Sequence, residues 1–444
     1  MNNVRTNRNS RGQEYLPGPV FRTLGIGLIL ILLMSGCDWN GEEGNGIVFW
    51  EKLSSYHELG RLTKEEIGES YPTLFQAVLH YDVTVYRVVY NTRTTDGETV
   101  QASGVILLPQ NVEEHQVLNL NRSAIFHEDE APSNVDLGNP DFRNMFWGNL
   151  APIVASSGMI VIMPDLLGWG QSSDLFHPFM IPASDELVAF DMLVASQELL
   201  ETEDVEWKGD LFLAGYSQGA TTATALLKAI QNDSQNRFDV TRASVGGGVL
   251  NPEGVVEAIL EREEMSAPQM YAFSLKAYRN TYFPDIPLST LFNSPYDLII
   301  VQDQLFRGGF RGSEIAERLP GQTGELIFQF FRNQFLAGSE QLLRSALIEN
   351  DLTDFEVRVP FRIYHGGMDE VIPIDEAVRA FDRLDQFDPS QMELYIVEEG
   401  DHLSTAETYF LETFFWFMQD PGFKKIAEDL PKLPIRTEAL LNDR

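Results

Sequence analysis

The sequence predicts an α/β protein in which a mainly parallel sheet is covered by helices on both faces. Three observations support this prediction. Short apolar segments alternate with helix-like segments through most of the chain, which is typical of parallel strands joined by helical crossovers. A serine lies in a strand–turn–helix segment at 215–219. A run of helix-like segments rich in aromatic residues, at 251–353, interrupts the alternation as an insertion.

The first 36 residues have the composition of an export signal. Four arginines precede an apolar segment from Leu24 to Met34, and the small residues Ser35 and Gly36 follow it. A positive region, a short apolar region and small residues are typical of a secretory signal. The apolar region is also shorter than the roughly 20 residues that span a bilayer. We therefore expect residues 1–36 to be a signal peptide.

Cys37 follows this segment directly and is the only cysteine of the chain. The residues from Met34 to Cys37 resemble a bacterial lipobox, although methionine is less usual than leucine at its position. A single cysteine cannot form an intramolecular disulfide, so we expect lipid attachment, with simple secretion or an incidental thiol as alternatives. Residues 37–46 are polar and glycine-rich and predict a flexible tether. The expected location is the bacterial cell envelope, with a membrane anchor at Cys37.

The net charge of the chain limits the kinds of partner that it is expected to bind. The net charge is −34, and the signal segment carries four Arg and one Glu, so its removal leaves −37. Nucleic acid is therefore excluded as an expected partner, because phosphate binding requires the opposite sign. The sequence contains no metal-ligand spacing such as His-Glu-x-x-His and no glycine-rich phosphate loop after a strand. We expect no cofactor and no metal.

Residues 47–250 and 354–444 are expected to form the α/β domain. The first two strands are joined through Asp96 and Gly97, which is a hairpin signal. The remaining strands are short apolar or alternating segments bounded by turn residues. We predict strands at 82–91, 98–109, 122–127, 158–165, 211–214, 242–250 and 391–398, a strand that begins at 361, and helices at 182–201 and 220–230.

The pentapeptide Gly-Tyr-Ser-Gln-Gly at 215–219 lies between a strand and a helix. Such a sharp turn lifts the hydroxyl of Ser217 out of the sheet and points a helix N-terminus at it. Gly215 and Gly219 flank the serine where the strand and helix backbones nearly touch. The five-residue pattern alone is weak, and its strand–turn–helix context gives it weight.

An acid and a histidine follow later in the chain, each just after a strand. A serine hydroxyl needs an imidazole to take its proton, and the imidazole needs a carboxylate to fix its tautomer. Asp369 follows the strand that begins at 361, and His402 is the only one of the seven histidines that follows the last strand. We assign His402 as general base and acid, and Asp369 as the orienting carboxylate. The fallback acids are Asp375 and Glu370; Asp401 is expected to shape the loop, and His365 to make local contacts.

This order of serine, acid and histidine resembles the α/β-hydrolase superfamily, and most of all its secreted bacterial esterases and lipases. The segment Asp-Leu-Leu-Gly-Trp-Gly at 165–170 is similar to the loop after the fourth strand of that family. The resemblance covers about residues 82–250 and 356–418. It implies a serine ester hydrolase that acts on a small-molecule or lipid ester and forms an acyl-enzyme on Ser217. It also implies that the insertion at 251–353 stands over the active site as a helical cap.

The resemblance further implies an oxyanion site made by two backbone N–H groups. One donor is Gln218, directly after the nucleophile. The second is Glu128 or Asp129, because these residues follow the predicted strand at 122–127. Related lipases commonly have His-Gly at this point, whereas this chain has three acidic residues at 128–130. Their carboxylates would oppose an oxyanion unless they face solvent or pair with a cation, and an acidic surface loop is the alternative.

Two questions remain open from the sequence. The aromatic stripes of the cap, at 271–283 and 328–335, either line an acyl-chain pocket or form the core of the cap, and we expect the core role for most of them. A serine peptidase on the same fold and a non-catalytic surface-binding lipoprotein are the other possible functions. The acidic run at 128–130 is the one feature that favours the non-catalytic alternative.

Overall fold

The computed structural model describes residues 52–420 except 72, 113–114, 139–149, 208–209 and 303. These residues belong to the unit Phe49–Arg444, one of two compact units into which the chain divides. The predicted signal peptide, Cys37 and the tether lie outside the described residues. Among the helices that are described, none is both long and apolar enough to cross a membrane.

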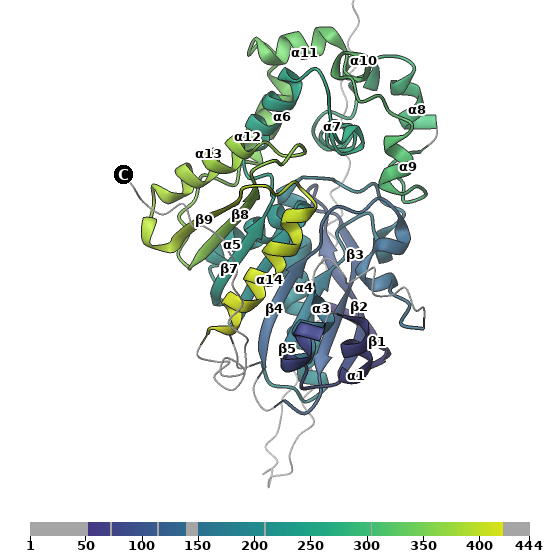
Figure 1. The fold of residues 1–444 in the computed structure, drawn as a ribbon. Helices are drawn as coiled ribbons and strands as arrows, with labels where there is room; N and C mark the ends of the chain where they lie inside the picture. Colours follow the sequence, from purple (N-terminus) through teal and green to yellow (C-terminus); the bar gives the residue numbers. More distant parts are fainter. Residues whose placement is uncertain are drawn as a thin grey trace, which may run out of the picture. The chain divides into compact units, whose positions relative to one another are not determined.

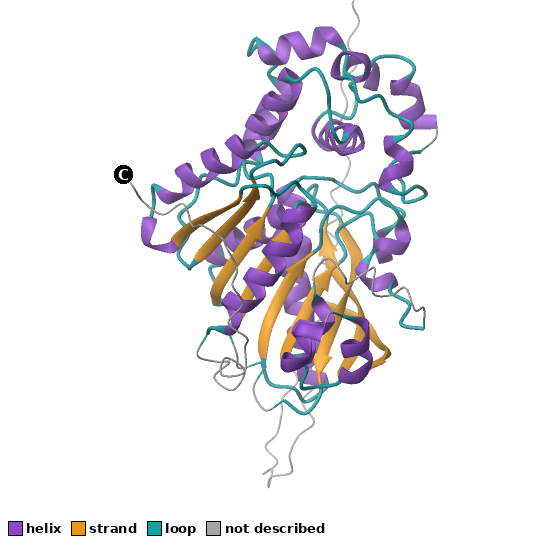
Figure 2. Cartoon of the chain, in the orientation of Figure 1, coloured by secondary structure: helices purple, strands orange, loops and turns teal. Residues whose placement is uncertain are grey.

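The described strands form one nine-stranded sheet in the order β1-β2-β3-β5-β4-β6-β7-β8-β9 (Figure 2). The pairs from β5 through β9 are parallel, and β1, β2 and β3 add antiparallel pairs at one side. The prediction of a mainly parallel sheet is therefore confirmed. The strands are β1 Leu53–Leu62, β2 Val83–Arg93, β3 Thr99–Pro109, β4 Gln116–Asn121, β5 Met159–Pro164, β6 Leu211–Tyr216, β7 Val240–Gly246, β8 Phe361–Gly366 and β9 Met392–Val397.

Helices cover both faces of this sheet (Figure 1). One apolar core joins the sheet to α4 Pro182–Thr202, α5 Gln218–Asn232 and α13 Ile374–Asp385. A second core, on the opposite face, joins it to α1 Lys64–Ser70, α3 Ala151–Ser156 and α14 Ser404–Met418. Short 3-10 turns complete the connections: η1 Thr73–Val78, η2 Glu128–Glu130, η3 Pro132–Asn134, η5 Gly170–Ser172 and η7 Pro389–Gln391.

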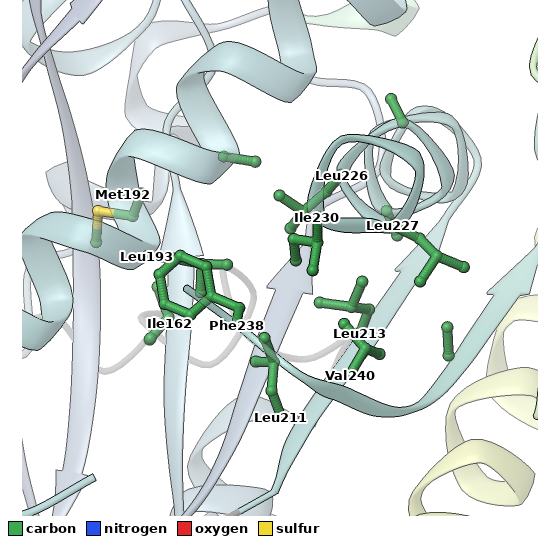
Figure 3. Packing of buried hydrophobic residues seen from close by; sticks show 14 of the residues in the cluster. Ile162, Met192, Leu193, Leu211, Leu213, Leu226, Leu227, Ile230, Phe238 and Val240 are labelled. Carbon is green, nitrogen blue, oxygen red and sulfur yellow. The ribbon is translucent and has the colours of Figure 1, made fainter. Parts of the chain in front are cut away.

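Strand β6 shows how the alternation of side chains builds these two cores. Leu211 and Leu213 belong to the core under α4 and α5, whereas Phe212 and Ala214 belong to the core on the other face. This is the two-residue period of a strand, and both sets are apolar because both faces are buried. Figure 3 shows Leu213 below Leu227 of α5, and Leu211 farther along the strand near Phe238. The strand therefore holds the residue that follows it, Ser217, on a rigid base.

The predicted strand at 122–127 is wrong in position. The strand is β4, six residues upstream, and residues 122–127 form the loop that follows it. Asn119 and Asn121 interrupt the apolar pattern of β4 although both are buried. The Asn121 amide satisfies part of their polarity by donating to Asn119 Oδ1 at 2.7 Å and to the Ala214 carbonyl at 3.3 Å. Buried amides that form a hydrogen bond with one another are tolerated inside a sheet. Because these polar residues interrupt the apolar pattern, the sequence did not indicate this strand.

The segment between β7 and β8 is helical. We call residues 251–353 the cap. Its helices share a third apolar core with the loops at 124–131 and 166–183. The helices are α6 Pro252–Glu261, α7 Pro268–Tyr282, α8 Tyr296–Gln302, α9 Gly312–Ala316, α10 Thr323–Leu326, α11 Gln329–Leu336 and α12 Leu342–Glu349, with the 3-10 turn η6 Leu288–Thr290.

Candidate active site

Ser217 lies at the apex of a tight turn between β6 and α5. Its backbone has φ 57° and ψ −120°, a conformation that side chains rarely adopt and that marks stored strain. The turn is closed so tightly that a Cβ on Gly215 would lie 2.0 Å from the Gly219 carbonyl oxygen. The Ser217 N–H donates to the Gly246 carbonyl at 2.8 Å, which fixes the turn to β7. The strand–turn–helix prediction for this segment is confirmed.

The structure brings Ser217, His402 and Asp369 together. His402 Nε2 lies 3.0 Å from Ser217 Oγ, and His402 Nδ1 lies 2.7 Å from Asp369 Oδ2. All three side chains are largely buried. The residues follow β6, β9 and β8, whose parallel carboxyl ends meet at one edge of the sheet. This is the hydrogen-bonded chain of hydroxyl, imidazole and carboxylate that nucleophilic catalysis requires.

The second oxygen of Asp369 is held by the backbone. Asp369 Oδ1 accepts hydrogen bonds from the N–H groups of Val371 at 2.9 Å and Ile372 at 2.8 Å. These bonds stabilise the charged carboxylate and leave Oδ2 for His402. The fallback acids, Asp375 and Glu370, are both exposed, and the structure gives neither a contact with His402.

His365 and Asp401 have the local roles that were expected. His365 Nε2 donates to the Ile372 carbonyl at 2.9 Å, and burial lowers the pKa of this imidazole. Asp401 Oδ1 accepts from the N–H groups of Leu403 at 2.9 Å and Ser404 at 2.7 Å. Asp401 thereby shapes the turn that presents His402.

Tyr216, directly before Ser217, contacts His402 and helps to hold it in position. Its hydroxyl donates to the His402 carbonyl at 2.7 Å, and the two rings lie 5.4 Å apart. Tyr409 of α14 connects the same region, since its hydroxyl accepts from the Gly215 N–H and donates to the Ser244 carbonyl, both at 2.8 Å. The serine turn and the histidine loop are thus held together by buried aromatic side chains.

Gln218 is the first residue of α5, and its N–H has no hydrogen-bond partner in the part of the chain that the structure describes. The first N–H groups of a helix lack intrahelical partners, so this donor is free beside Ser217. The Glu128 N–H, by contrast, donates to the Gly308 carbonyl of the cap at 3.1 Å. That bond engages the one hydrogen of the group, which disfavours Glu128 as an oxyanion donor; the assignment stays a prediction.

The acidic run at 128–130 holds loops together. Glu128 Oε1 accepts from the Gly170 N–H and from Asn134 Nδ2, each at 3.0 Å. Arg311 of the cap lies 3.2 Å from Glu130 Oε1 and 3.6 Å from Asp129 Oδ2. The carboxylates of Asp129 and Glu130 therefore pair with a cation, which is the condition under which they would not oppose an oxyanion. The Glu128 carboxylate is held by uncharged donors instead.

The sequence did not indicate Ser123, which the structure places next to the turn at Ser217. Its hydroxyl donates to the Tyr216 carbonyl at 3.1 Å, and its own N–H has no partner among the described residues. The backbone just before it is so close to the turn that a Cβ on Gly219 would lie 2.0 Å from the Asn121 carbonyl oxygen. The correct position of β4 would have identified this residue, since it lies two residues past that strand.

A cavity opens beside Ser217 and extends into the cap. Its walls come from α6, α7 and α12 and from the loop at 371–372. Nearly all of its lining is apolar, including Val255, Ile259, Leu275, Leu343 and Leu347. Of the aromatic stripes, Tyr271 and Tyr278 line this cavity, whereas Phe273, Phe331 and Phe335 are buried in the core of the cap.

No cluster of metal-ligating side chains occurs within the described residues. The chain was also compared with known proteins. No family model matches it, and no curated protein matches it.

Solved structures do match. A protein from Legionella pneumophila, provisionally assigned as a hydrolase, is 22% identical with a TM-score of 0.75, and the match covers 83% of this chain and 98% of that one. The rice cell wall degrading esterase LipA from Xanthomonas oryzae is 20% identical with a TM-score of 0.72, over 84% of this chain and 98% of that one. Candida antarctica lipase A is 16% identical with a TM-score of 0.60, over 86% and 83%.

The chain has the α/β-hydrolase fold. The three proteins share this fold with the chain at sequence identities of 16 to 22%. Within the α/β-hydrolase fold, the candidate active site lies at the carboxyl ends of the parallel strands, which is where open α/β sheets bind ligands. The cap enters the chain between β7 and β8, so it stands at that same edge.

Proposed function

We propose that this chain is a serine ester hydrolase of the carboxylesterase or lipase type. The observation that carries the proposal is the hydrogen-bonded chain from Ser217 Oγ through His402 to Asp369, with distances of 3.0 and 2.7 Å. The structural neighbours include a LipA esterase and a lipase, which agrees with the proposal.

In the first half of the reaction, His402 Nε2 takes the proton of Ser217 Oγ as that oxygen attacks the ester carbonyl carbon. Asp369 stabilises the imidazolium through Nδ1–H. The tetrahedral intermediate then collapses, the carbon–oxygen bond to the alcohol breaks, and His402 gives its proton to the leaving alkoxide. The acyl group remains on Ser217, and a water activated by His402 releases it as the acid.

The negative charge of the intermediate needs backbone donors. We assign the Gln218 N–H as one donor, because it is free and lies directly after the nucleophile. We assign the Ser123 N–H as the second, in place of Glu128, because the Ser123 hydroxyl bonds the Tyr216 carbonyl beside Ser217. Loss of one such donor typically lowers kcat by about 10²–10³-fold.

The cavity beside Ser217 supports an ester with an apolar acyl chain. Its lining offers few polar groups, so a chain of methylenes would bury surface there at about 0.8 kcal/mol per methylene. A peptide side chain with hydrogen-bonding groups would leave them unsatisfied on these walls. This observation favours ester over peptide substrates.

The test is hydrolysis of p-nitrophenyl esters from acetate to palmitate by the wild type and by Ser217→Ala. We expect the substitution to lower kcat by several orders of magnitude, because the nucleophile is lost. A matched change at another buried hydroxyl outside the site, Ser244→Ala, should keep activity within a few-fold. Full activity in Ser217→Ala would refute the proposal. Inactivity of the wild type on every ester, together with cleavage of aminoacyl amides, would identify a peptidase.

We also propose that the mature protein is anchored at the cell envelope through a lipid on Cys37. The support is the sequence of residues 1–37, which lies outside the described residues. Mass spectrometry of the N-terminal peptide from native membranes should find an acylated Cys37. A soluble mature protein with an unmodified Cys37 would contradict this proposal.

A further inference from the structure

His177 contacts the residue that follows the candidate nucleophile. It lies in the loop between η5 and α4, and its side chain is buried. His177 Nε2 lies 2.9 Å from the side-chain Nε2 of Gln218, and His177 Nδ1 lies 2.6 Å from the Leu167 carbonyl oxygen. The imidazole therefore connects the loop after β5 to the first residue of α5.

These two contacts select one protonation state of His177. A carbonyl oxygen only accepts, so Nδ1 carries the hydrogen toward Leu167. An amide nitrogen only donates, so Nε2 is the bare nitrogen that accepts from Gln218. Burial agrees with this assignment, because desolvation lowers the pKa of His177 to about 4. The imidazole is thus a neutral Nδ1–H tautomer at the pH values at which esterases work.

Aromatic packing holds the imidazole in place. Its ring centre lies 5.5 Å from that of Trp169, 5.8 Å from that of Phe179 and 5.7 Å from that of Phe273 on α7. The backbone is equally confined, since a Cβ on Gly168 would lie 2.5 Å from His177 Cα. These contacts, together with the hydrogen bond from Nδ1 to the Leu167 carbonyl, hold the ring as an acceptor for Gln218.

We propose that His177 is a positioning residue for the oxyanion site. By holding the Gln218 side chain, it fixes the peptide plane whose N–H faces the substrate carbonyl, next to the strained backbone of Ser217. His177 touches no reacting atom and exchanges no proton. The inference rests on the proposed function, in which the Gln218 N–H stabilises the oxyanion.

Kinetics test this role with one variant from each side of the contact. His177→Phe removes the acceptor and Gln218→Met removes the donor. We expect each to lower kcat on p-nitrophenyl butyrate by about 10–100-fold, less than the loss of a whole oxyanion donor, with KM changed less than threefold. The double variant should be no slower than the slower single variant, because one interaction is lost only once. His177→Gln, whose amide oxygen reaches the position of Nε2, should recover most of the lost kcat.

A trifluoromethyl ketone provides a second readout, because it forms a tetrahedral adduct with serine that places an oxyanion in the same site. His177→Phe should weaken its inhibition by about the factor by which kcat falls. Phe176→Leu is the matched control, since Phe176 packs on Phe273 in the same aromatic cluster and does not contact Gln218. This control should keep both kcat and inhibition. A His177→Phe variant that melts earlier but keeps kcat would show that the role is structural only, and would overturn the proposal.

Nitrogen-15 NMR of histidine-labelled protein tests the geometry without any activity. We expect the Nδ1–H tautomer for His177, with a further downfield shift of Nε2 in Gln218→Met as that nitrogen loses its donor. An Nε2–H tautomer would overturn the proposal. The two proposals fail separately: full activity in Ser217→Ala refutes the enzyme mechanism and leaves the tautomer as it is, whereas an essential Ser217 with unchanged kcat in His177→Phe refutes only the positioning role.

Discussion

At the scale of single residues, the candidate site depends on how the oxygens of Asp369 are shared among their hydrogen-bond donors. Asp369 divides its oxygens, with Oδ1 on two backbone N–H groups and Oδ2 on His402. This arrangement leaves the imidazole one possible tautomer, with its bare Nε2 toward Ser217. A carboxylate is needed at this position because it must both accept from Nδ1–H and stabilise the imidazolium that forms.

Asp369→Asn should therefore lower kcat by about 10⁴-fold, since an amide can hold the ring in the wrong tautomer and carries no charge. KM should change little, because the side chain does not line the cavity. The measurement is steady-state hydrolysis of p-nitrophenyl butyrate. Asp375→Asn, the same change at the exposed fallback acid, should behave as the wild type. Equal losses in both variants would show that Asp369 has been assigned wrongly.

A second buried acid affects stability. Asp185 of α4 accepts from the Thr222 hydroxyl of α5 at 2.8 Å, and burial raises its pKa to about 8. The unfolded value is about 3.9, so between pH 4 and pH 8 the native state holds more protons than the unfolded state. Stability linked to this group therefore falls as pH rises across that window.

Asp185→Asn removes the ionisation and should remove this slope. Urea unfolding at pH 5 and at pH 8 measures this pH dependence. The free energy of unfolding of the wild type, relative to that of Asp185→Asn, should be lower at pH 8 than at pH 5. A substitution at an exposed acid on a different surface helix, Asp382→Asn, provides the comparison and should leave the slope of the wild type unchanged. A difference between wild type and Asp185→Asn that is the same at both pH values would contradict the assignment.

At the scale of elements, the aromatic residues of the cap divide by burial. Helix α11 carries Phe335, which is fully buried against Arg344, and Phe330, which is 65% exposed. The sequence presents these two residues as one stripe, but only Phe335 packs in the core of the cap. Over the whole set, Phe273, Tyr278 and Phe331 also belong to this core, and Tyr271, Tyr282 and Phe283 pack against it, which agrees with the expected core role for most cap aromatics.

Phe335→Ala should lower the free energy of unfolding by about 3–5 kcal/mol, because it removes a buried ring and leaves a cavity. Phe330→Ala on the same helix should change it by no more than about 0.5 kcal/mol. Denaturant unfolding followed by fluorescence compares the two. Similar losses at both positions would mean that the cap is packed differently from the structure.

At the scale of the molecule, the sheet and the cap each contribute one side of the site. The sheet supplies Ser217, Asp369 and His402 from the ends of separate strands, and α6, α7 and α12 supply the apolar walls. The cap is also joined to the core by polar contacts, of which Arg311 with Glu130 is one. Because the cavity lies between the sheet and the cap, the packing of both layers is expected to decide which acyl chains fit.

Leu347→Trp on α12 should shorten the preferred acyl chain, because the larger side chain fills part of the cavity. We expect hydrolysis of the acetate ester to stay within about twofold and hydrolysis of long-chain esters to fall. Its neighbour Ile348 is 57% exposed, so Ile348→Trp is the matched control and should keep the wild-type profile. An unchanged chain-length profile in Leu347→Trp would show that the acyl chain binds elsewhere.

The sequence by itself determined the fold class, the turn at Ser217 and the order of the three candidate catalytic residues. These are local signals, since a strand, a tight turn and a helix can each be recognised from neighbouring residues. The same reasoning misplaced β4, because the buried amides of Asn119 and Asn121, joined by one hydrogen bond, break the apolar pattern of the strand. This misplacement directed the prediction of the second oxyanion donor to Glu128, whereas we propose Ser123.

Only the tertiary structure decided which distant groups meet. It paired Ser123 with the carbonyl before Ser217, His177 with Gln218, and Arg311 with Asp129 and Glu130. It also showed which aromatic residues of the cap line the cavity, Tyr271 and Tyr278, and which of the phenylalanines are buried in the core of the cap. Each of these contacts joins segments far apart in the chain, and their geometry depends on how the layers pack, which periodicity and spacing along one segment do not record.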